Sequence, residues 1–301
     1  MASRFTVELD CLDREKWLEL RRTGIGSSDA PAVLGLSPFG SPLSVYVDKL
    51  GFREDREATE AMRWGIKLEP LIAEEFRRET QRKVELSGFL LRSKERPWQI
   101  ATLDATQESI EHDGPGVLEI KATGFRAGDW TNGIPDHVYA QVQHQLDVTG
   151  YGWGSVAVLL FGCRMLWADV ARDDAFLDKM RAAEGELWRR VETGEPVAPD
   201  GTDASREALR LLYPEDTGEV VALPGDLIGL DAERQALKAE LSAGQKRLDA
   251  IDNSLRAAIG AASAGELANG VTYTHRLQKR KAYTVKESAF RVLRRSEPRS
   301  K

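Results

Sequence analysis

Residues 98–122 read WQIATLDATQESIEHDGPGVLEIKA, and this stretch decides the fold. Its β-favouring residues predict two short strands, at residues 98–106 and 117–122. The polar segment between them ends in Asp-Gly-Pro-Gly at residues 113–116, which is typical of a turn. We therefore expect two strands joined by a polar turn at the centre of the chain.

Three charged side chains of these strands are expected to meet. Side chains alternate between the two faces of a strand, so Glu119 and Lys121 share one face, and Asp104 lies on one face with Ile100 and Thr102. Carboxylates hold Mg²⁺, the metal acidifies a water, and a nearby ammonium can orient that water. The same pattern also occurs on ordinary solvated strands, so phosphodiester hydrolysis is a hypothesis at this point.

Composition narrows the class of protein. The chain has 301 residues, which suffice for one large domain or a domain with an appendage, and its formal net charge is −6. Any DNA contact must therefore come from local basic patches. No apolar run has the length of a membrane span, and the first residues lack the apolar core of a signal peptide, so we expect a cytoplasmic protein without membrane contact.

Cysteine and histidine are too scarce to build a soft metal site. Cys11 and Cys163 are the two cysteines, and the four histidines are scattered. This excludes a disulfide framework, a zinc knuckle and a four-cysteine iron–sulfur cluster. We expect oxygen ligands for any catalytic metal.

A glycine-rich turn near the N-terminus has two interpretations. The sequence GIGSSD at residues 24–29 follows a helix predicted over residues 13–22, and a short helix comes after it. A turn that enters a helix presents free backbone N–H groups to an anion, and Arg21 lies just before it. The same pattern is typical of an ordinary N-cap by Ser28 or Asp29. The two interpretations are compatible.

A second candidate carboxylate precedes a strong predicted helix at residues 71–83. Ile72 and Phe76 mark the apolar stripe of that helix, and Glu69 falls at the border of the stripe. A carboxylate at the edge of a buried face needs a partner, which a metal or its waters would supply. Alternatively, Glu69 accepts hydrogen bonds near the helix start, where negative charge is favoured.

The remaining elements predict an α/β core with a mixed sheet. Residues 136–148, DHVYAQVQHQLDV, form a predicted helix with Gln141 beside its apolar stripe. The other core elements are predicted strands at residues 86–92, 155–161 and 165–170 and a predicted helix at residues 174–191. Helices, a run of strands, a helix and two more strands are the order expected of such a core.

Six separated motifs agree with one family. They are WxxLR at residues 17–21, GIGSSD at 24–29, WGxxLEP at 64–70, the strand with Asp104, LEIK at 118–121 and AQVQ at 140–143. In this order they resemble the phage lambda exonuclease and YqaJ-type viral recombinase nucleases, a branch of the PD-(D/E)xK superfamily. The resemblance spans residues 12–200. It implies a restriction-endonuclease-like core, with a central mixed β-sheet flanked by helices and a C-terminal helical appendage.

The resemblance implies a metal site in this chain. Asp104 and Glu119 match the residues that ligate the catalytic metals, together with the backbone carbonyl of Ile120. Glu69 matches a ligand or outer-shell acceptor beside them. The implied cofactor is Mg²⁺, with Mn²⁺ as a substitute, bound as two ions that stabilise the attacking and leaving oxygens.

The resemblance also implies roles for residues around the metals. Lys121 would position or activate the attacking water, and Gln141 would orient that water or the scissile phosphate. Arg21 and Ser28 match positions that bind phosphates near the cleavage site, including a terminal 5′-phosphate. One departure is Val138, which stands where the lambda enzyme has a tyrosine, so a tyrosine role is not carried over.

The implied function is a metal-dependent exonuclease that hydrolyses one strand of linear duplex DNA, 5′→3′, in phage-type recombination or DNA end processing. The resemblance further implies a homo-oligomeric ring such as a trimer, a single-strand annealing protein as partner, and a phage- or prophage-encoded protein in the bacterial cytoplasm. Two alternatives stay open: a structure-specific endonuclease of the same superfamily, and a catalytically inactive DNA-binding or scaffold relative.

We expect three segments: a PD-(D/E)xK exonuclease core at residues 1–200, a linker or wrap at 201–226, and a long helix with a basic tail at 227–301. The helix predicted over residues 231–260 has heptad spacing, which suits a coiled coil or packing on a neighbouring domain. Residues 271–277 and 282–285 are predicted to pair as a small hairpin. The basic tail is typical of a DNA-backbone contact and equally of a solvated tail.

Overall fold

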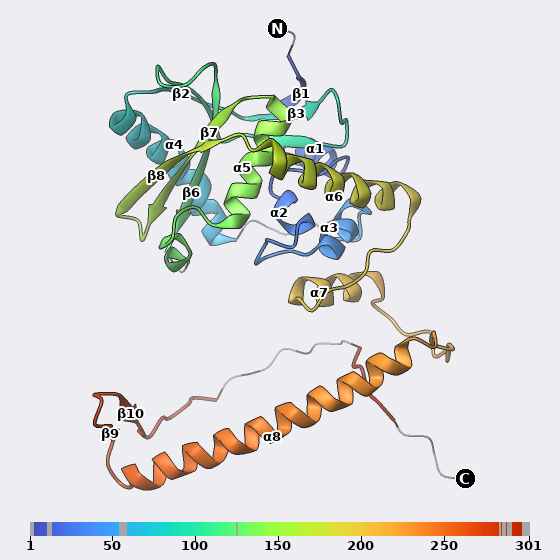
Figure 1. Cartoon of the computed structure of the whole chain (residues 1–301), viewed down its shortest axis with the longest axis vertical. Coiled ribbons are helices and arrows are strands. Elements are labelled where there is room, and N and C mark those ends of the chain that lie inside the picture. The colour runs from blue at the N-terminus through green and yellow to red at the C-terminus, as the bar shows by residue number, and fades with distance from the viewer. Residues whose placement is uncertain are drawn as a thin grey trace. The chain divides into compact units, whose positions relative to one another are not determined.

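A five-stranded sheet forms the centre of the first of two compact units of the chain (Figure 1). In order across the sheet its strands are β2 (Lys83–Leu86), β5 (Ala105–Glu108), β6 (Gly116–Thr123), β7 (Trp153–Leu160) and β8 (Arg164–Ala171). The computed structural model describes residues 3–10, 14–53, 59–124, 126–282, 284, 287 and 291–296. These fall into two compact units, Met1–Pro214 and Glu215–Lys301.

The sheet is mixed, as predicted. Strands β6 and β7 are parallel, with Glu119 opposite Val156, and the other neighbouring pairs are antiparallel. Parallel neighbours need a crossover connection, which α5 (Asp136–Thr149) supplies. Strand β6 and helix α5 confirm the elements predicted at residues 117–122 and 136–148.

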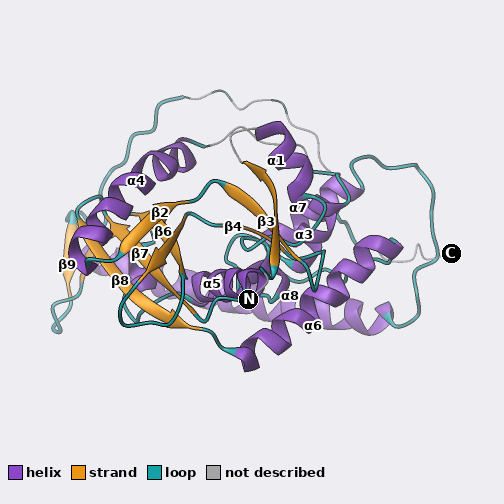
Figure 2. Cartoon of the chain, turned by 90° about the horizontal axis from the view of Figure 1, so that it is seen from above, coloured by secondary structure: helices purple, strands orange, loops and turns teal. Residues whose placement is uncertain are grey.

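Two helices cover opposite faces of the sheet (Figure 2). Leu118 of β6 packs in one core cluster with Phe76 of α4 (Glu60–Thr80), whereas Val117 packs in another with Val142 of α5. Because side chains alternate along β6, Glu119 lies on the α5 side together with Val117. The predicted alternation is therefore confirmed.

The strand predicted over residues 98–106 is wrong, because the chain changes sheets within it. It divides into β4 and β5, with Leu103 and Asp104 between them. A second, three-stranded antiparallel sheet has the order β1 (Phe5–Asp10), β3 (Phe89–Ser93) and β4 (Ile100–Thr102). Asp104 thus lies at the corner between the two sheets and not on a strand face beside Ile100 and Thr102.

Helix α4 begins eleven residues before the predicted start at residue 71 and contains Pro70. The side chain of Thr59 caps its N-terminus by accepting the N–H of Met62. Proline removes one backbone donor, but the long apolar stripe still packs on the sheet, so the helix continues. It ends at Thr80, and the chain then forms β2 and β3 instead of one strand at residues 86–92.

Shorter helices complete the first unit. They are α1 (Arg14–Arg21), α2 (Ala30–Val33), α3 (Pro42–Lys49), the 3₁₀ helix η1 (Ala127–Trp130), α6 (Asp174–Thr193) and α7 (Asp203–Leu212). Ser41 and Ser44 form a capping box at the start of α3. The Ser205 hydroxyl of α7 donates to the Ser41 hydroxyl at 2.9 Å, so α7 packs against α3 within this unit.

The second unit contains a long helix and a small hairpin. Helix α8 (Leu227–Ile259) has no buried side chain, and β9 (Ala264–Glu266) pairs with β10 (Thr272–Thr274). The first strand of the hairpin predicted between residues 271–277 and 282–285 is present as β10, but it pairs with β9, which precedes it in the sequence. Residues 283, 285, 286, 288–290 and 297–301 of the predicted C-terminal segment lie outside the described residues. No helix among the described residues is both long and apolar enough to cross a membrane.

Candidate active site

The predicted glutamate, lysine and glutamine form one hydrogen-bonded group. Glu119 is buried, and Lys121 donates to its Oε1 atom. The amide of Gln141 donates to the same Oε1 at 2.7 Å, and Lys121 also donates to Gln141 Oε1 at 3.1 Å. Strand β6 supplies the first two residues on one face and helix α5 supplies the third, so the crossover connection assembles the group.

Asp104 joins this group from the corner between the two sheets. Pairing of β5 with β6 ends where Ala105 lies opposite Leu118. Just beyond that point, Oδ2 of Asp104 accepts the backbone N–H of Ile120 at 2.7 Å. The carboxylate is thereby held beside the residue that lies between Glu119 and Lys121 in the sequence.

The charges of the site are unbalanced. The pKa of Asp104 is well above its usual value, first because the carboxyl group is buried and then because Glu119 carries a like charge. Burial and Glu119 also raise the pKa of Glu69. Burial lowers the pKa of Lys121, but Glu119 and Asp104 outweigh that effect and raise it overall. Three carboxylates thus surround one ammonium group.

Glu69 reaches the site from the middle of α4. The helix begins at Glu60, so the interpretation of Glu69 as an acceptor near a helix start is wrong. It is half-buried and lies close enough to Glu119 and Lys121 for both to shift its pKa. The structure therefore brings Glu69 to the same acidic site as the sheet carboxylates.

The residues of the site fit a hard divalent cation. Asp104, Glu119, Glu69 and the carbonyl of Ile120 offer only oxygen atoms, which Mg²⁺ prefers. Burial and mutual repulsion make the ionised carboxylates costly, and a cation would remove that cost.

Another group of metal-ligand type lies elsewhere on the first unit. Glu111, His112 and Asp169 each offer a ligand atom, and these atoms lie within 4.8 Å of one another. However, the guanidinium of Arg82 donates to both oxygens of Asp169, at 2.7 and 2.8 Å, and Ser155 donates to one of them. The charge of Asp169 is therefore already balanced within the protein.

The GIGSSD turn is held by side chains that the sequence did not reveal. Asp29 stands at the N-cap position of α2 without a side-chain capping bond, so the ordinary N-cap interpretation is wrong for it. Its carboxylate instead accepts the Gly26 N–H at 3.0 Å and the buried ammonium of Lys49 at 2.6 Å. The guanidinium of Arg21 lies 3.6 Å from the carboxylate of Asp29 and 3.7 Å from that of Asp48, so two carboxylates flank it at ion-pair distance.

Arg21 and Ser28 face the same cavity as the acidic site. This cavity of about 220 Å³ is lined by both residues and also by Trp17, Asp104 and Gln141. The structure thus brings the predicted phosphate-binding residues together with the predicted catalytic ones, although they are far apart in the sequence.

Gln145 is a residue of this site that the motifs did not indicate. It is buried on α5, and its Nε2 atom donates to Oε2 of Glu119 at 2.7 Å. The only signal in the sequence is its position one helical turn after Gln141, and a polar face gives the same spacing.

This fold is shared with alkaline exonucleases. The crystal structure of the alkaline exonuclease LHK-Exo from Laribacter hongkongensis superimposes with a TM-score of 0.50 and 20% sequence identity, over 60% of this chain and 93% of that chain. The structure of LHK-Exo in complex with dAMP gives the same TM-score at 19% identity. The central mixed sheet and its helices therefore define an exonuclease-like α/β protein.

Sequence comparison gives the family. The YqaJ-like viral recombinase domain matches residues 16–152. The uncharacterized protein YqaJ of Bacillus subtilis (strain 168) is 31% identical over 268 residues, which cover 86% of this chain and 82% of that protein. The chain therefore belongs to the YqaJ-like viral recombinase family, and the resemblance drawn from its motifs is confirmed.

Proposed function

We propose that this protein is a metal-dependent deoxyribonuclease that hydrolyses one strand of linear duplex DNA from its 5′ end. The observation that carries the proposal is the cavity shared by Arg21, Ser28, Asp104 and Gln141, beside the group formed by Glu119, Lys121 and Gln141. Such a site offers a cation ligand and an arginine that can bind phosphate in one cavity, with a fixed ammonium beside it.

Asp104, Glu119, the Ile120 carbonyl and Glu69 would hold Mg²⁺, with Mn²⁺ as a substitute, as one or two ions. The bound metal supplies an acidified water and screens the charge that develops on the phosphate. The raised pKa keeps Lys121 protonated, so it acts as a donor that orients the attacking water or a phosphate oxygen.

Arg21 would hold the terminal phosphate. Its guanidinium lies between Asp29 and Asp48, which attract it toward this cavity wall, and Ser28 adds a hydroxyl donor there. A 5′-phosphate bound there keeps the next phosphodiester within reach of Asp104 and Gln141, which explains exonuclease action from a 5′ end.

The comparisons support the same reaction class. LHK-Exo is an alkaline exonuclease whose structure is known with dAMP, and the matching family is one of viral recombinases. We extend the proposal to a phage- or prophage-encoded protein of the bacterial cytoplasm that acts as a ring-shaped homo-oligomer beside a single-strand annealing protein. In this scheme residues 1–200 are the nuclease core, 201–226 a linker or wrap whose helix α7 packs on that core, and 227–301 a helix and basic tail for DNA or partner contact.

The proposal is tested by digestion of linear duplexes with 5′-phosphate or 5′-hydroxyl ends and of closed circles, with and without Mg²⁺. We expect wild type to degrade only linear duplexes, only with metal, and faster from 5′-phosphate ends. Lys121→Ala should lose at least 100-fold in rate, whereas Lys83→Ala, on the exposed edge strand, should not. Digestion of circles would indicate an endonuclease, and binding without cleavage by wild type would indicate an inactive relative.

A further inference from the structure

We propose that a second cavity, beside Lys121, is a binding site for an unpaired nucleobase of the DNA strand that is cut. Its stacking residues are Phe39, Arg126, Trp130 and His137. The proposal rests on the nuclease function above and adds a site for the base to the sites for phosphate and metal.

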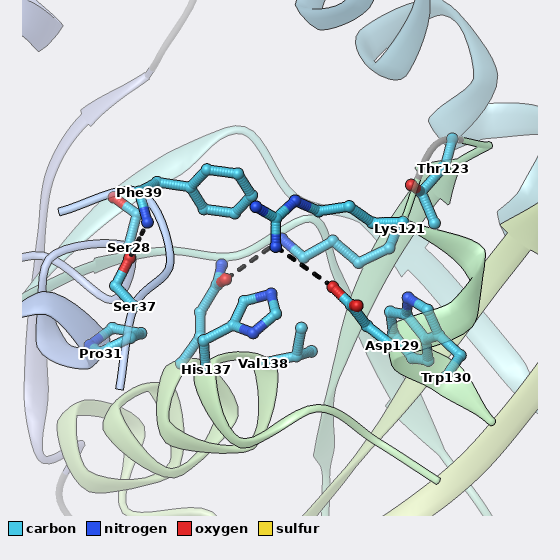
Figure 3. Close-up of a pocket in the computed structure, with 13 residues that line it drawn as sticks. Ser28, Pro31, Ser37, Phe39, Lys121, Thr123, Asp129, Trp130, His137 and Val138 are labelled. Carbon is cyan, nitrogen blue, oxygen red and sulfur yellow. Dashed lines mark hydrogen bonds and ion pairs between the residues drawn. The ribbon is translucent and has the colours of Figure 1, made fainter. Parts of the chain in front are cut away.

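The cavity measures about 320 Å³, which lies within the range of small-ligand pockets. Figure 3 shows Phe39 on one side of the hollow, His137 below it, and Asp129 and Trp130 on the other side. Lys121 and Gln141, the donors of the acidic site, also line it. A ligand in this cavity therefore touches the residues that act at the scissile phosphate.

The side chains of the cavity offer flat stacking surfaces. The guanidinium carbon of Arg126 lies 4.5 Å from the centroid of the Phe39 ring, and the His137 ring meets the same phenyl edge-to-face at 6.0 Å. Aromatic rings and arginine planes are the groups on which unpaired bases stack, and such stacking is tolerant of base identity.

Phe39 is exposed but firmly held. Its side chain is 66% exposed, so burial in the core does not explain a phenyl group at this position. Its backbone N–H donates to the Ser37 hydroxyl at 3.1 Å. A Cβ at Gly40 would lie only 2.9 Å from the Ala32 Cβ, so the turn packs closely on α2. The turn thus holds the backbone at Phe39, and Arg126 and His137 contact its ring, so the ring loses little freedom when a ligand stacks on it.

At the wall of the cavity away from Lys121, the charges favour a base over a phosphate. Arg126 is already paired with Asp129, whose carboxylate lies 3.3 Å from the guanidinium and would repel an anion. Burial and the neighbouring charge of Lys121 lower the pKa of His137, so its imidazole is neutral at neutral pH. A flat, uncharged ligand therefore suits this wall of the cavity.

The two cavities lie on either side of Gln141. Gln141 and Ser28 line both; Arg21 and Asp104 line only the first, and Lys121 lines only the second. A phosphodiester at Gln141 would therefore place one nucleoside beside Arg21 and direct the nucleoside on its other side into the second cavity. That second base must leave the duplex stack to enter, which fits a stacking site next to a point of strand cleavage.

The test uses short 5′-phosphorylated duplexes that carry one tetrahydrofuran abasic residue at each of the first four positions of the cut strand in turn. In wild type we expect one position at which loss of the base raises KM about 5- to 150-fold, the range for one stacked base. Phe39→Ala and Arg126→Ala should raise KM on the intact duplex and should abolish the extra effect of that abasic residue. The Kd values of the same duplexes can also be measured in EDTA, where binding is observed without cleavage.

Two matched controls lie outside the cavity. Phe161 at the turn between β7 and β8 is 68% exposed, and Arg206 pairs with Asp203 three residues away, as Arg126 does with Asp129. Phe161→Ala and Arg206→Ala should retain the abasic effect of wild type.

Two outcomes would overturn the proposal. Full sensitivity of Phe39→Ala to the abasic residue would show that the base does not stack there. An equal loss by Arg126→Ala on intact and abasic duplexes would show a phosphate contact. If wild type binds with the expected abasic pattern but cuts nothing, the nucleobase site stands and the nuclease proposal fails.

Discussion

Gln145 donates its Nε2 hydrogen to Oε2 of Glu119 at 2.7 Å, and its own Oε1 has no partner among the described residues. The opposite amide orientation would place two oxygens against each other, so this bond fixes the orientation. Glu119 thus receives donors at both oxygens, from Gln145 at one and from Gln141 and Lys121 at the other. Its carboxylate is locked in place, as a metal ligand requires.

Gln145→Ala should weaken metal use. We expect the Mg²⁺ concentration for half-maximal activity to rise about 10- to 100-fold, because Glu119 loses a donor that orients it. Gln143 is the matched control: it is also a fully buried glutamine on α5, but its amide donates to the carbonyl of Ala171 at 2.7 Å. Both alanine variants should lose about 1–3 kcal/mol of stability. An identical Mg²⁺ dependence of the two variants would remove the positioning role.

Asp104→Asn should stabilise the metal-free protein while abolishing activity. Burial and Glu119 raise the folded-state pKa of Asp104, so its stability contribution is present at acid pH and lost as pH rises; at neutral pH the ionised form is a cost. The neutral amide keeps an oxygen for the Ile120 N–H and removes that cost. In EDTA we expect the Tm of the variant to exceed that of wild type, by about 2–4 °C for each kcal/mol gained in the free energy of unfolding.

Added Mg²⁺ should make wild type more stable than Asp104→Asn, which reverses the order of their Tm values in EDTA. Wild type gains stability by binding the ion, whereas Asp104→Asn should gain little. Thermal unfolding in EDTA and in Mg²⁺ measures both effects, and Mg²⁺ stabilisation of the variant equal to that of wild type would place the ion elsewhere.

Arg21→Ala should erase the preference for 5′-phosphorylated ends. One charge-assisted contact is worth about 1.5–3 kcal/mol, so we expect a loss of about 10- to 150-fold on 5′-phosphate ends and little on 5′-hydroxyl ends. Arg22→Ala is the control, since that guanidinium donates to the Arg53 carbonyl at 3.2 Å. A preference that survives in Arg21→Ala would refute the assignment of the phosphate site.

Asp147→Asn should lower stability and flatten its dependence on acid pH. Burial opposes ionisation of Asp147, but Arg181, Arg96 and Arg172 surround its carboxylate and hold its pKa far below the usual value. The contribution of Asp147 to folding stability is therefore fully present above about pH 4, the pKa of an aspartate in the unfolded chain, and it is lost as the pH falls below that value. Removing this buried charge leaves the three arginines with the more exposed carboxylates of Glu95, Asp174 and Asp178 as partners, and we expect a loss of stability of about 3–5 kcal/mol.

Tryptophan fluorescence during urea unfolding at several pH values below 7 measures this effect, because all seven tryptophans lie before residue 214. Asp203→Asn, in an exposed ion pair of α7, should change stability by less than about 1 kcal/mol. If the free energy of unfolding of Asp147→Asn falls with decreasing pH as steeply as that of wild type, the prediction is contradicted.

The sequence indicated those parts of the site that depend on local geometry. The two-residue period of a strand places Glu119 and Lys121 on one face whatever their surroundings, and the apolar stripe of α5 fixes the side on which Gln141 lies. Local patterns also suggested that Asp104 meets these residues and that Arg21 lies beside an anion-binding turn at Ser28. The specific roles of metal ligand and 5′-phosphate contact came from resemblance between motifs. No local pattern indicated that Gln145 would be buried against Glu119, or that Lys49 would be buried against Asp29.

The sequence alone was thus enough to predict most of the helices, the strands β6, β7 and β8 and the family, because periodicity and motif order are properties of short segments. Only the tertiary structure decided that the chain changes sheets at Asp104, that α4 continues through Pro70, and that a cavity between Phe39 and Trp130 opens beside the acidic site. The reason is physical: these features arise where segments distant in sequence compete for the same backbone donors and the same buried surface, and a single segment carries no record of that competition.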